Sequence, residues 1–117
     1  MHGLMAVDKN GKPLTNILLW SDVRADAIAR SLRQGRDGLD IYRRTGVPIH
    51  AMSPLCKLIW MRQNQPHVFQ KAHQFLDIKS YVWFRLTGEF RSDVSVASAS
   101  GLLNIEQQIW DEPAMEM

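Results

Sequence analysis

The stretch from Ile17 to Ile28 reads Ile-Leu-Leu-Trp-Ser-Asp-Val-Arg-Ala-Asp-Ala-Ile, and it decides the fold that we expect for this chain. Its first four residues are apolar and end on an aromatic ring, which is typical of a buried strand. Ser21 and Asp22 follow, with side-chain oxygens that can accept hydrogen bonds from the free amides at the start of a helix. We therefore expect a strand over residues 17–20 that leads directly into a helix over residues 22–34.

The expected helix has one apolar face, whose members recur at helical spacing. They are Ala25, Ile28, Ala29 and Leu32. The junction before it holds Trp20, Asp22 and Arg24, and ligands in open α/β sheets bind where strands end in this way. The same three residues can equally be a packed indole, a helix cap and a surface guanidinium, and spacing alone favours that interpretation.

A β-hairpin is expected at the N-terminal end. Leu4–Val7 is apolar, Asp8–Gly11 has the composition of a turn, and a second strand covers residues 14–20. A two-stranded hairpin is marginal in water, so strand 4–7 needs a further neighbour. We expect that neighbour to precede this chain, which would leave one strand edge unpaired here. Unpaired edges favour pairing with another chain, so we also expect a homo-oligomer.

Helices dominate the remaining sequence. The capping residues Ser53 and Asp77 predict helices over 53–63 and 78–87. A short helix over 39–44, strands over 74–76 and 102–105, and the start of a helix over 110–117 complete the pattern. In the 78–87 helix, the residues expected to face inward are Ile78, Tyr81, Val82 and Leu86. Trp60 and Trp83 are both expected to be buried.

The composition excludes several classes of partner. The chain has 117 residues, 45% of them hydrophobic, and its formal net charge is only +2. Its longest basic run is Arg43-Arg44, which predicts neither nucleic-acid nor membrane binding. The single cysteine, Cys56, cannot form an internal disulfide and suits a reducing compartment. We therefore expect a cytoplasmic protein.

Local chemical motifs are few. The sequence lacks a glycine-rich phosphate loop and a paired-cysteine zinc pattern. Its four histidines show no metal-ligand spacing, so no metal site is expected. Cys56 is interpreted as a small core thiol, although a helix start can lower the pKa of a thiol. Lys57 either reaches a ligand phosphate or points into water, and we favour water.

The order of the motifs resembles the FGGY family of carbohydrate kinases. The resemblance covers nearly the whole chain and rests on Met1-His2-Gly3-Leu4, the Asp-x-x-Gly-x-Pro-Leu run at 8–14, Trp20-x-Asp22-x-Arg24, residues 45–50, 52–55, 57–58, 76–81 and 86–90, Asp93, residues 97–105 and Trp110-Asp111. The segments Met-Ser-Pro-Leu (52–55) and Ser-Gly-Leu-Leu-Asn-Ile (100–105) look most like those of the gluconate kinase branch, and the xylulokinase branch is the next nearest.

The resemblance implies a fold and a domain assignment. Residues 1–117 would be a helix-rich α/β fragment of an actin-like, ribonuclease-H-like ATPase domain, with a short β-hairpin at its N-terminus. It would lack the first strands of that domain, its end and the whole C-terminal domain. ATP and Mg²⁺ would serve the intact enzyme and neither would bind this fragment. The general base would lie outside it, so the isolated fragment is expected to be inactive.

The resemblance also implies a set of substrate-binding residues, which are Met1, His2, Trp20, Asp22, Arg24 and Met52. A histidine can both donate and accept hydrogen bonds to sugar hydroxyls. Met52 stands where the glycerol-specific branch has a tyrosine, which puts a polar contact there in doubt. Arg24 suits a sugar carboxylate because its guanidinium can pair bidentately, but a structural pair with Asp22 or Asp26 is at least as well favoured.

Two alternatives to a gluconate kinase segment remain open. One is a segment of a xylulose kinase, or of a kinase for another pentulose or polyol. The other is a non-catalytic helical interaction module that has kept the sequence of the family without its chemistry.

Overall fold

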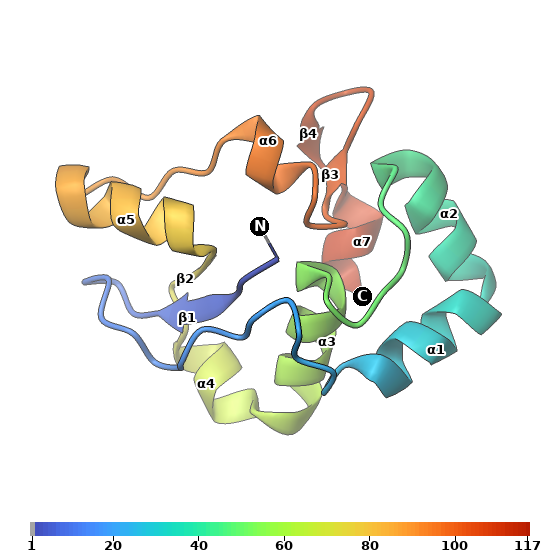
Figure 1. Ribbon diagram of the computed structural model, residues 1–117, viewed down its shortest axis with the longest axis horizontal. Helices are drawn as coiled ribbons and strands as arrows, with labels where there is room; N and C mark the ends of the chain where they lie inside the picture. Colours follow the sequence, from blue (N-terminus) through green and yellow to red (C-terminus); the bar gives the residue numbers. More distant parts are fainter. Residues whose placement is uncertain (1) are drawn as a thin grey trace.

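The computed structural model describes residues 2–117, in which short helices surround two small antiparallel sheets (Figure 1). The elements, in chain order, are β1 (Met5–Val7), α1 (Asp26–Gln34), α2 (Arg36–Thr45), α3 (Pro54–Asn64), α4 (Pro66–Lys71), β2 (Gln74–Leu76), α5 (Ile78–Thr87), α6 (Val94–Ala97), β3 (Leu103–Asn104), β4 (Ile109–Trp110) and α7 (Glu112–Glu116). Helices outnumber strands, as the sequence predicts.

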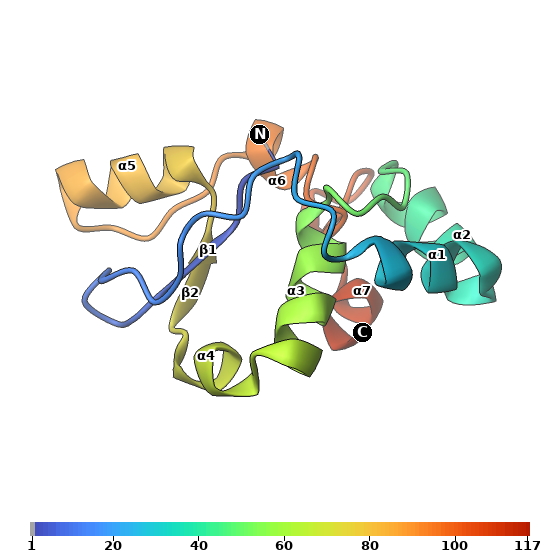
Figure 2. The same cartoon turned by 60° about the horizontal axis from the view of Figure 1, so that its bottom comes forward.

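Helix α3 lies between the two parts of the molecule. Figure 2 shows β1, β2 and α5 on one side of it and α1 and α2 on the other. The hydroxyl of Ser53 accepts a hydrogen bond from the Cys56 amide at 3.4 Å, and Pro54 occupies the first helical position, as predicted. Most of the first two turns of α3 is buried, so this helix belongs to the core on both of its sides.

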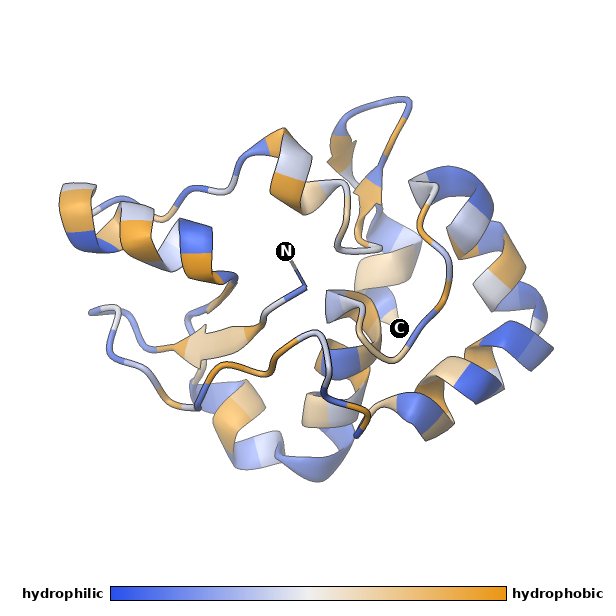
Figure 3. Cartoon of the chain, viewed as in Figure 1, coloured by the Kyte–Doolittle hydropathy of each residue, from blue (hydrophilic) through white to orange (hydrophobic). Residues whose placement is uncertain are grey.

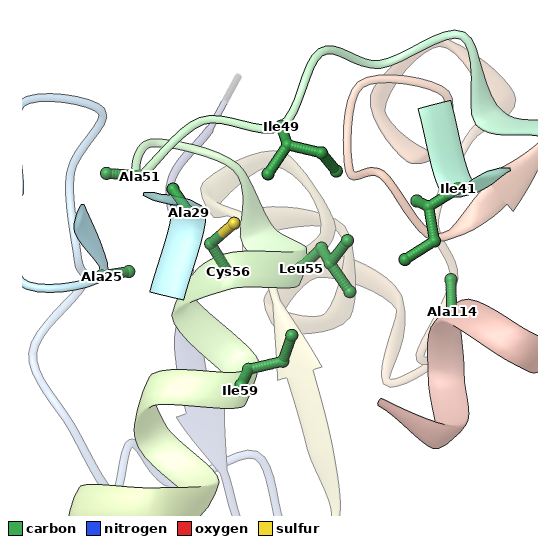
Figure 4. Packing of buried hydrophobic residues seen from close by; sticks show 9 residues of the cluster. All are labelled: Ala25, Ala29, Ile41, Ile49, Ala51, Leu55, Cys56, Ile59 and Ala114. Carbon is green, nitrogen blue, oxygen red and sulfur yellow. The ribbon is translucent and has the colours of Figure 1, made fainter. Parts of the chain in front are cut away.

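The largest hydrophobic cluster joins α1, α2, α3 and α7 (Figure 4). Its buried members are Ala25, Ala29, Ile41, Ile49, Ala51, Leu55, Cys56, Ile59 and Ala114. Ala25 and Ala29 belong to the predicted apolar face of the first helix, and their small side chains let α1 approach α3 closely. Gly38 is needed where α2 turns back against α1, because a Cβ there would lie 2.1 Å from the Leu32 carbonyl oxygen.

The predicted hairpin differs from the structure in its pairing. β1 pairs with β2, with Met5 opposite Leu76, and its other edge forms isolated bridges to Pro13 and Leu18. The expected unpaired edge of strand 4–7 is therefore wrong, because both edges are engaged within the chain. The expected strand over 17–20 is reduced to one bridge at Leu18.

The first helix also begins later than predicted. Asp22 accepts a hydrogen bond from the Arg24 amide at 3.0 Å and so forms a turn instead of capping a helix. Helix α1 begins at Asp26, after Ala25, which offers no capping side chain. Gly35 then ends α1 and directly precedes α2, which begins at Arg36 and not at Leu39.

Helix α5 has the predicted ends, but of its four predicted inner residues only Tyr81 faces inward. Asp77 caps it and Gly88 ends it in a left-handed conformation. The side chains of Ile78, Val82 and Leu86, expected inside, are exposed, and Trp83 is 46% exposed. The inner contacts come from Tyr81 and from Phe84, whose ring stacks on Phe90 at 4.2 Å. Hydrophobic residues occur along the whole of α5 (Figure 3), so periodicity could not identify its inner face.

The two tryptophan predictions therefore have different outcomes. Trp60 is half-buried, and it packs against two of the hydrophobic clusters. Trp83 is exposed on α5, a helix at the edge of the molecule (Figure 1), so its predicted burial is wrong.

A largely buried ion pair joins α2 to the start of α7. Arg44 donates two hydrogen bonds to the Asp111 carboxylate, at 2.7 and 3.0 Å, and the Asp111 side chain is only 2% exposed. Asp111 also accepts from the Ala114 amide at 3.0 Å and so caps α7. The hydrogen bonds from Arg44 lower the pKa of Asp111 below its usual value, although burial opposes this.

We predict that Asp111→Asn lowers the free energy of unfolding at pH 7 by about 2 kcal/mol, because it weakens a charge-assisted pair. A carboxyl whose folded pKa is lowered stabilises the fold above its unfolded pKa, and this contribution is lost as the pH falls through the folded pKa. The wild-type advantage should therefore be complete above about pH 4 and become progressively smaller as the pH falls below that value. Urea unfolding of both proteins at pH 7 and pH 3 measures this. The matched control is Glu106→Gln, since Glu106 is exposed and has no ion pair among the described residues. Equal losses at both pH values would contradict the prediction.

Candidate functional site

The candidate site is built around Lys57, which lies in the first two turns of α3. Its side chain is completely buried, and its Nζ donates hydrogen bonds to the carbonyl oxygens of His2 at 2.7 Å and Leu19 at 2.8 Å. A longer contact of 3.4 Å reaches the carbonyl of Leu18. The interpretation that Lys57 points into water is wrong, because the apolar residues around it in α3 carry it into the core.

His2 and Trp20 lie on neighbouring segments of the backbone. Leu4 and Leu18 form an antiparallel bridge, with backbone hydrogen bonds of 3.0 and 2.7 Å. Beyond this bridge, the carbonyls of His2 and Leu19 accept hydrogen bonds from the same Lys57 ammonium, so the two segments stay close together. The Trp20 side chain is 68% exposed. This excludes the interpretation of Trp20 as a packed indole and leaves its ring available to a ligand.

Asp22 and Arg24 form an ion pair beside this point. Nε of Arg24 lies 2.8 and 2.9 Å from the two carboxylate oxygens of Asp22, and the guanidinium lies over the Trp60 ring, 4.8 Å from its centre. Burial raises the pKa of Asp22, but the hydrogen bonds from Arg24 outweigh it and the net shift is downward. Asp22 is therefore an ionised acceptor. No hydrogen bond within residues 2–117 uses the two terminal nitrogens of Arg24.

His2 and Met52 line one pocket of about 330 Å³. His50 lines it too, and its Nδ1 accepts a hydrogen bond from the Met52 amide at 3.1 Å, so the neutral ring carries its proton on Nε2. Nδ1 of His2 is buried and has no hydrogen-bond partner among residues 2–117. Burial lowers the pKa of His2, and the positive charge of Lys57 lowers it further, so the ring is neutral at pH 7.

The predicted site residues therefore fall into two neighbouring groups. His2 and Met52 line the pocket, Asp22 and Arg24 form an ion pair next to Trp20, and Lys57 contacts the backbone of both segments. Met1 lies outside the described residues. A larger cavity of about 460 Å³ lies between β2, α3 and α6, and none of the predicted site residues lines it.

Sequence reasoning missed Lys57 and His50 as members of the site. The available signal for Lys57 was a lone cation inside an apolar helical run, and for His50 it was a ring two residues before Met52. Cys56, by contrast, is a core thiol as interpreted, since it is fully buried and burial raises its pKa. Among residues 2–117, none of the helices combines the length and the hydropathy of a membrane span.

Comparisons with known proteins identify the family of this chain. Residues 1–117 match the FGGY family of carbohydrate kinases, N-terminal domain. Gluconokinase of Bacillus subtilis is 38% identical over 117 residues, which are 100% of this chain and 23% of that protein. The crystal structures of gluconate kinase and of ligand-bound xylulose kinase from Lactobacillus acidophilus each match with a TM-score of 0.95 and 34% identity. Each match covers 99% of this chain and 24% of the solved one.

The chain thus spans less than a quarter of the length of these relatives. The matches confirm the expected fold class, a helix-rich α/β segment of an actin-like sugar kinase domain. The whole chain matches the family description, and its fold agrees with those of two solved sugar kinases. The chain therefore belongs to the FGGY family of carbohydrate kinases.

Proposed function

We propose that this chain is an internal segment of the N-terminal domain of an ATP-dependent sugar kinase and forms one wall of its carbohydrate pocket, with gluconate as the preferred substrate. The observation that carries the proposal is that Lys57 hydrogen-bonds both to His2, which lines the pocket with Met52, and to Leu19, in the segment that leads to the Asp22–Arg24 pair. The 38% identity to a gluconokinase supports the choice of substrate.

The side chains of this wall have the chemistry that a sugar acid requires. The ionised Asp22 accepts hydrogen bonds from hydroxyls, and neutral His2 can accept or donate them. The exposed indole of Trp20 offers a flat apolar surface to the carbon chain. The two terminal nitrogens of Arg24 can pair with a carboxylate, and Asp22 holds the guanidinium in place for this. Xylulose has no carboxylate, so Arg24 is the residue at which the two substrates should differ.

The role of the chain in the reaction is to bind and orient the sugar. Phosphoryl transfer depends mainly on positioning and on charge stabilisation. Among residues 2–117, no group of three His, Cys, Asp or Glu side chains is placed to hold a metal ion, so no step through Mg²⁺ is assigned to them. ATP and Mg²⁺ belong to the proposal through the family, at sites outside this chain.

We predict that Arg24→Lys in the intact kinase raises KM for gluconate by roughly tenfold, the factor that 1.4 kcal/mol carries. A lysine cannot reproduce bidentate pairing. KM for xylulose, measured in the same ADP-release assay, should change much less. Arg30→Lys is the matched control, because Arg30 lies on α1 and pairs with Asp26 on its surface. Equal increases for both sugars would contradict the assignment of Arg24 to a carboxylate, and an intact protein that phosphorylates only xylulose would favour the second candidate substrate.

The isolated 117-residue chain should not release ADP with any sugar, since the proposal places the general base and the nucleotide site elsewhere. A coupled assay with gluconate, xylulose and glycerol measures this, with a no-protein blank as the control. Turnover above the blank would contradict the proposal that the general base and the nucleotide site lie outside this chain. If calorimetry also detects no sugar binding by the intact protein, the non-catalytic interaction module becomes the better description.

We further propose that the isolated chain forms homo-oligomers. The engaged edges of β1 remove one reason for this, so the remaining support is the exposed apolar face of α5, formed by Ile78, Val82, Trp83 and Leu86. Light scattering at micromolar concentration should give a mass of two or more chains, whereas a single-chain mass at every dilution would contradict the proposal. A cytoplasmic location is also proposed, and its support is the one buried free thiol, Cys56.

A further inference from the structure

We infer that Lys57 is a positioning residue that holds the backbone of His2 and of the Leu19–Trp20 segment together, so that both segments present their side chains to the sugar. The inference rests on the proposed function, because it gives that sugar site its support. Lys57 itself touches no part of the proposed ligand surface, since its side chain is completely buried.

The first step of the argument is the set of acceptors around the ammonium group. An ammonium has three N–H donors, and Nζ of Lys57 has three carbonyl acceptors within 3.4 Å. They come from two segments that are 55 and 38–39 residues away in sequence. A buried charge without partners is very costly, so the ammonium and both segments are held in one arrangement.

The second step is that backbone pairing between the two segments stops at Leu4 and Leu18, and hydrogen bonds from Lys57 replace it beyond that point. Leu4 and Leu18 exchange two backbone hydrogen bonds, but no backbone hydrogen bond among the described residues joins 2–3 to 19–20. The carbonyls of His2 and Leu19 both accept from Nζ of Lys57 instead. The ammonium therefore links the backbones of these two residues, as a further pair of backbone hydrogen bonds would.

The third step concerns the polar groups that surround the ammonium. Burial lowers the pKa of Lys57, and the negative charge of Asp22 partly offsets this effect. The charge of Lys57 in turn contributes to the lowered pKa of His2, after burial. Lys57 thus helps to keep the His2 ring neutral while it fixes the backbone that carries this ring.

The test uses Lys57→Met in the intact kinase, with Met61→Ala as the matched control. Met61 is as deeply buried as Lys57 and lies one turn further along α3, where it packs against Leu18 without a hydrogen bond to any carbonyl. Lys57→Met should raise KM for the sugar roughly 10- to 100-fold, the range that a small misplacement of binding groups produces. KM for ATP should stay within about twofold. Met61→Ala should lower the thermal midpoint but leave KM for the sugar within about twofold.

A second variant keeps the inference testable if Lys57→Met does not fold. Lys57→Gln retains one donor group, and fluorine NMR of the isolated chain with labelled tryptophan reports on each indole. The Trp20 resonance should shift in Lys57→Gln, whereas the resonances of Trp83 and Trp110 should not. An unchanged Trp20 resonance, or a rise in sugar KM no larger than that of Met61→Ala, would overturn the inference. If the intact protein phosphorylates no sugar, the proposed function fails and the NMR result alone decides the role of Lys57.

Discussion

A single buried ammonium group imposes the main constraint on this structure. Lys57 lies in α3, the helix between the two parts of the molecule, and its charge is compensated by carbonyl groups from two other segments. The apolar residues around it bury α3 against α1, α2 and α7, and they leave the ammonium no access to water. The fold must therefore bring the backbone of residues 2 and 19 to this point, and the candidate site follows from that requirement.

Local signals in the sequence were sufficient for both ends of α3 and α5 and for the C-terminal ends of α1 and α2. Ser53 and Asp77 supply capping oxygens, and Gly46 and Gly88 adopt the left-handed conformation that ends a helix. These features act within four residues, so they can be identified without knowledge of the fold. Asp22 is the exception, because the guanidinium of Arg24 competes with helix amides for its carboxylate. A residue that can cap a helix can also close a turn, and spacing does not decide between them.

Non-local pairing set the limit of what could be predicted. β1 pairs with β2, and nothing within residues 4–20 indicates that Gln74–Leu76 will be the neighbour. The inner face of α5 could not be predicted in full either, because apolar side chains occur on nearly every side of this helix. That Phe84 faces inward depends on its stacking against Phe90. In the candidate site, family motifs suggested His2, Asp22 and Arg24, but the burial of Lys57 depends on segments that only the folded chain brings together.

The pairing of β1 with β2 also bears on how the segment folds during synthesis. Met5 leaves the ribosome long before its partner Leu76, and the helices α1 to α4 are made in the interval. Contacts between residues so distant in sequence form late, because the loop between them must close first. The helical part around α3 can pack early, whereas residues 4–7 stay without their sheet partner until residue 76 has emerged. Until then the nascent chain carries an apolar strand with one edge unpaired, and transiently unpaired strand edges make a chain prone to aggregation.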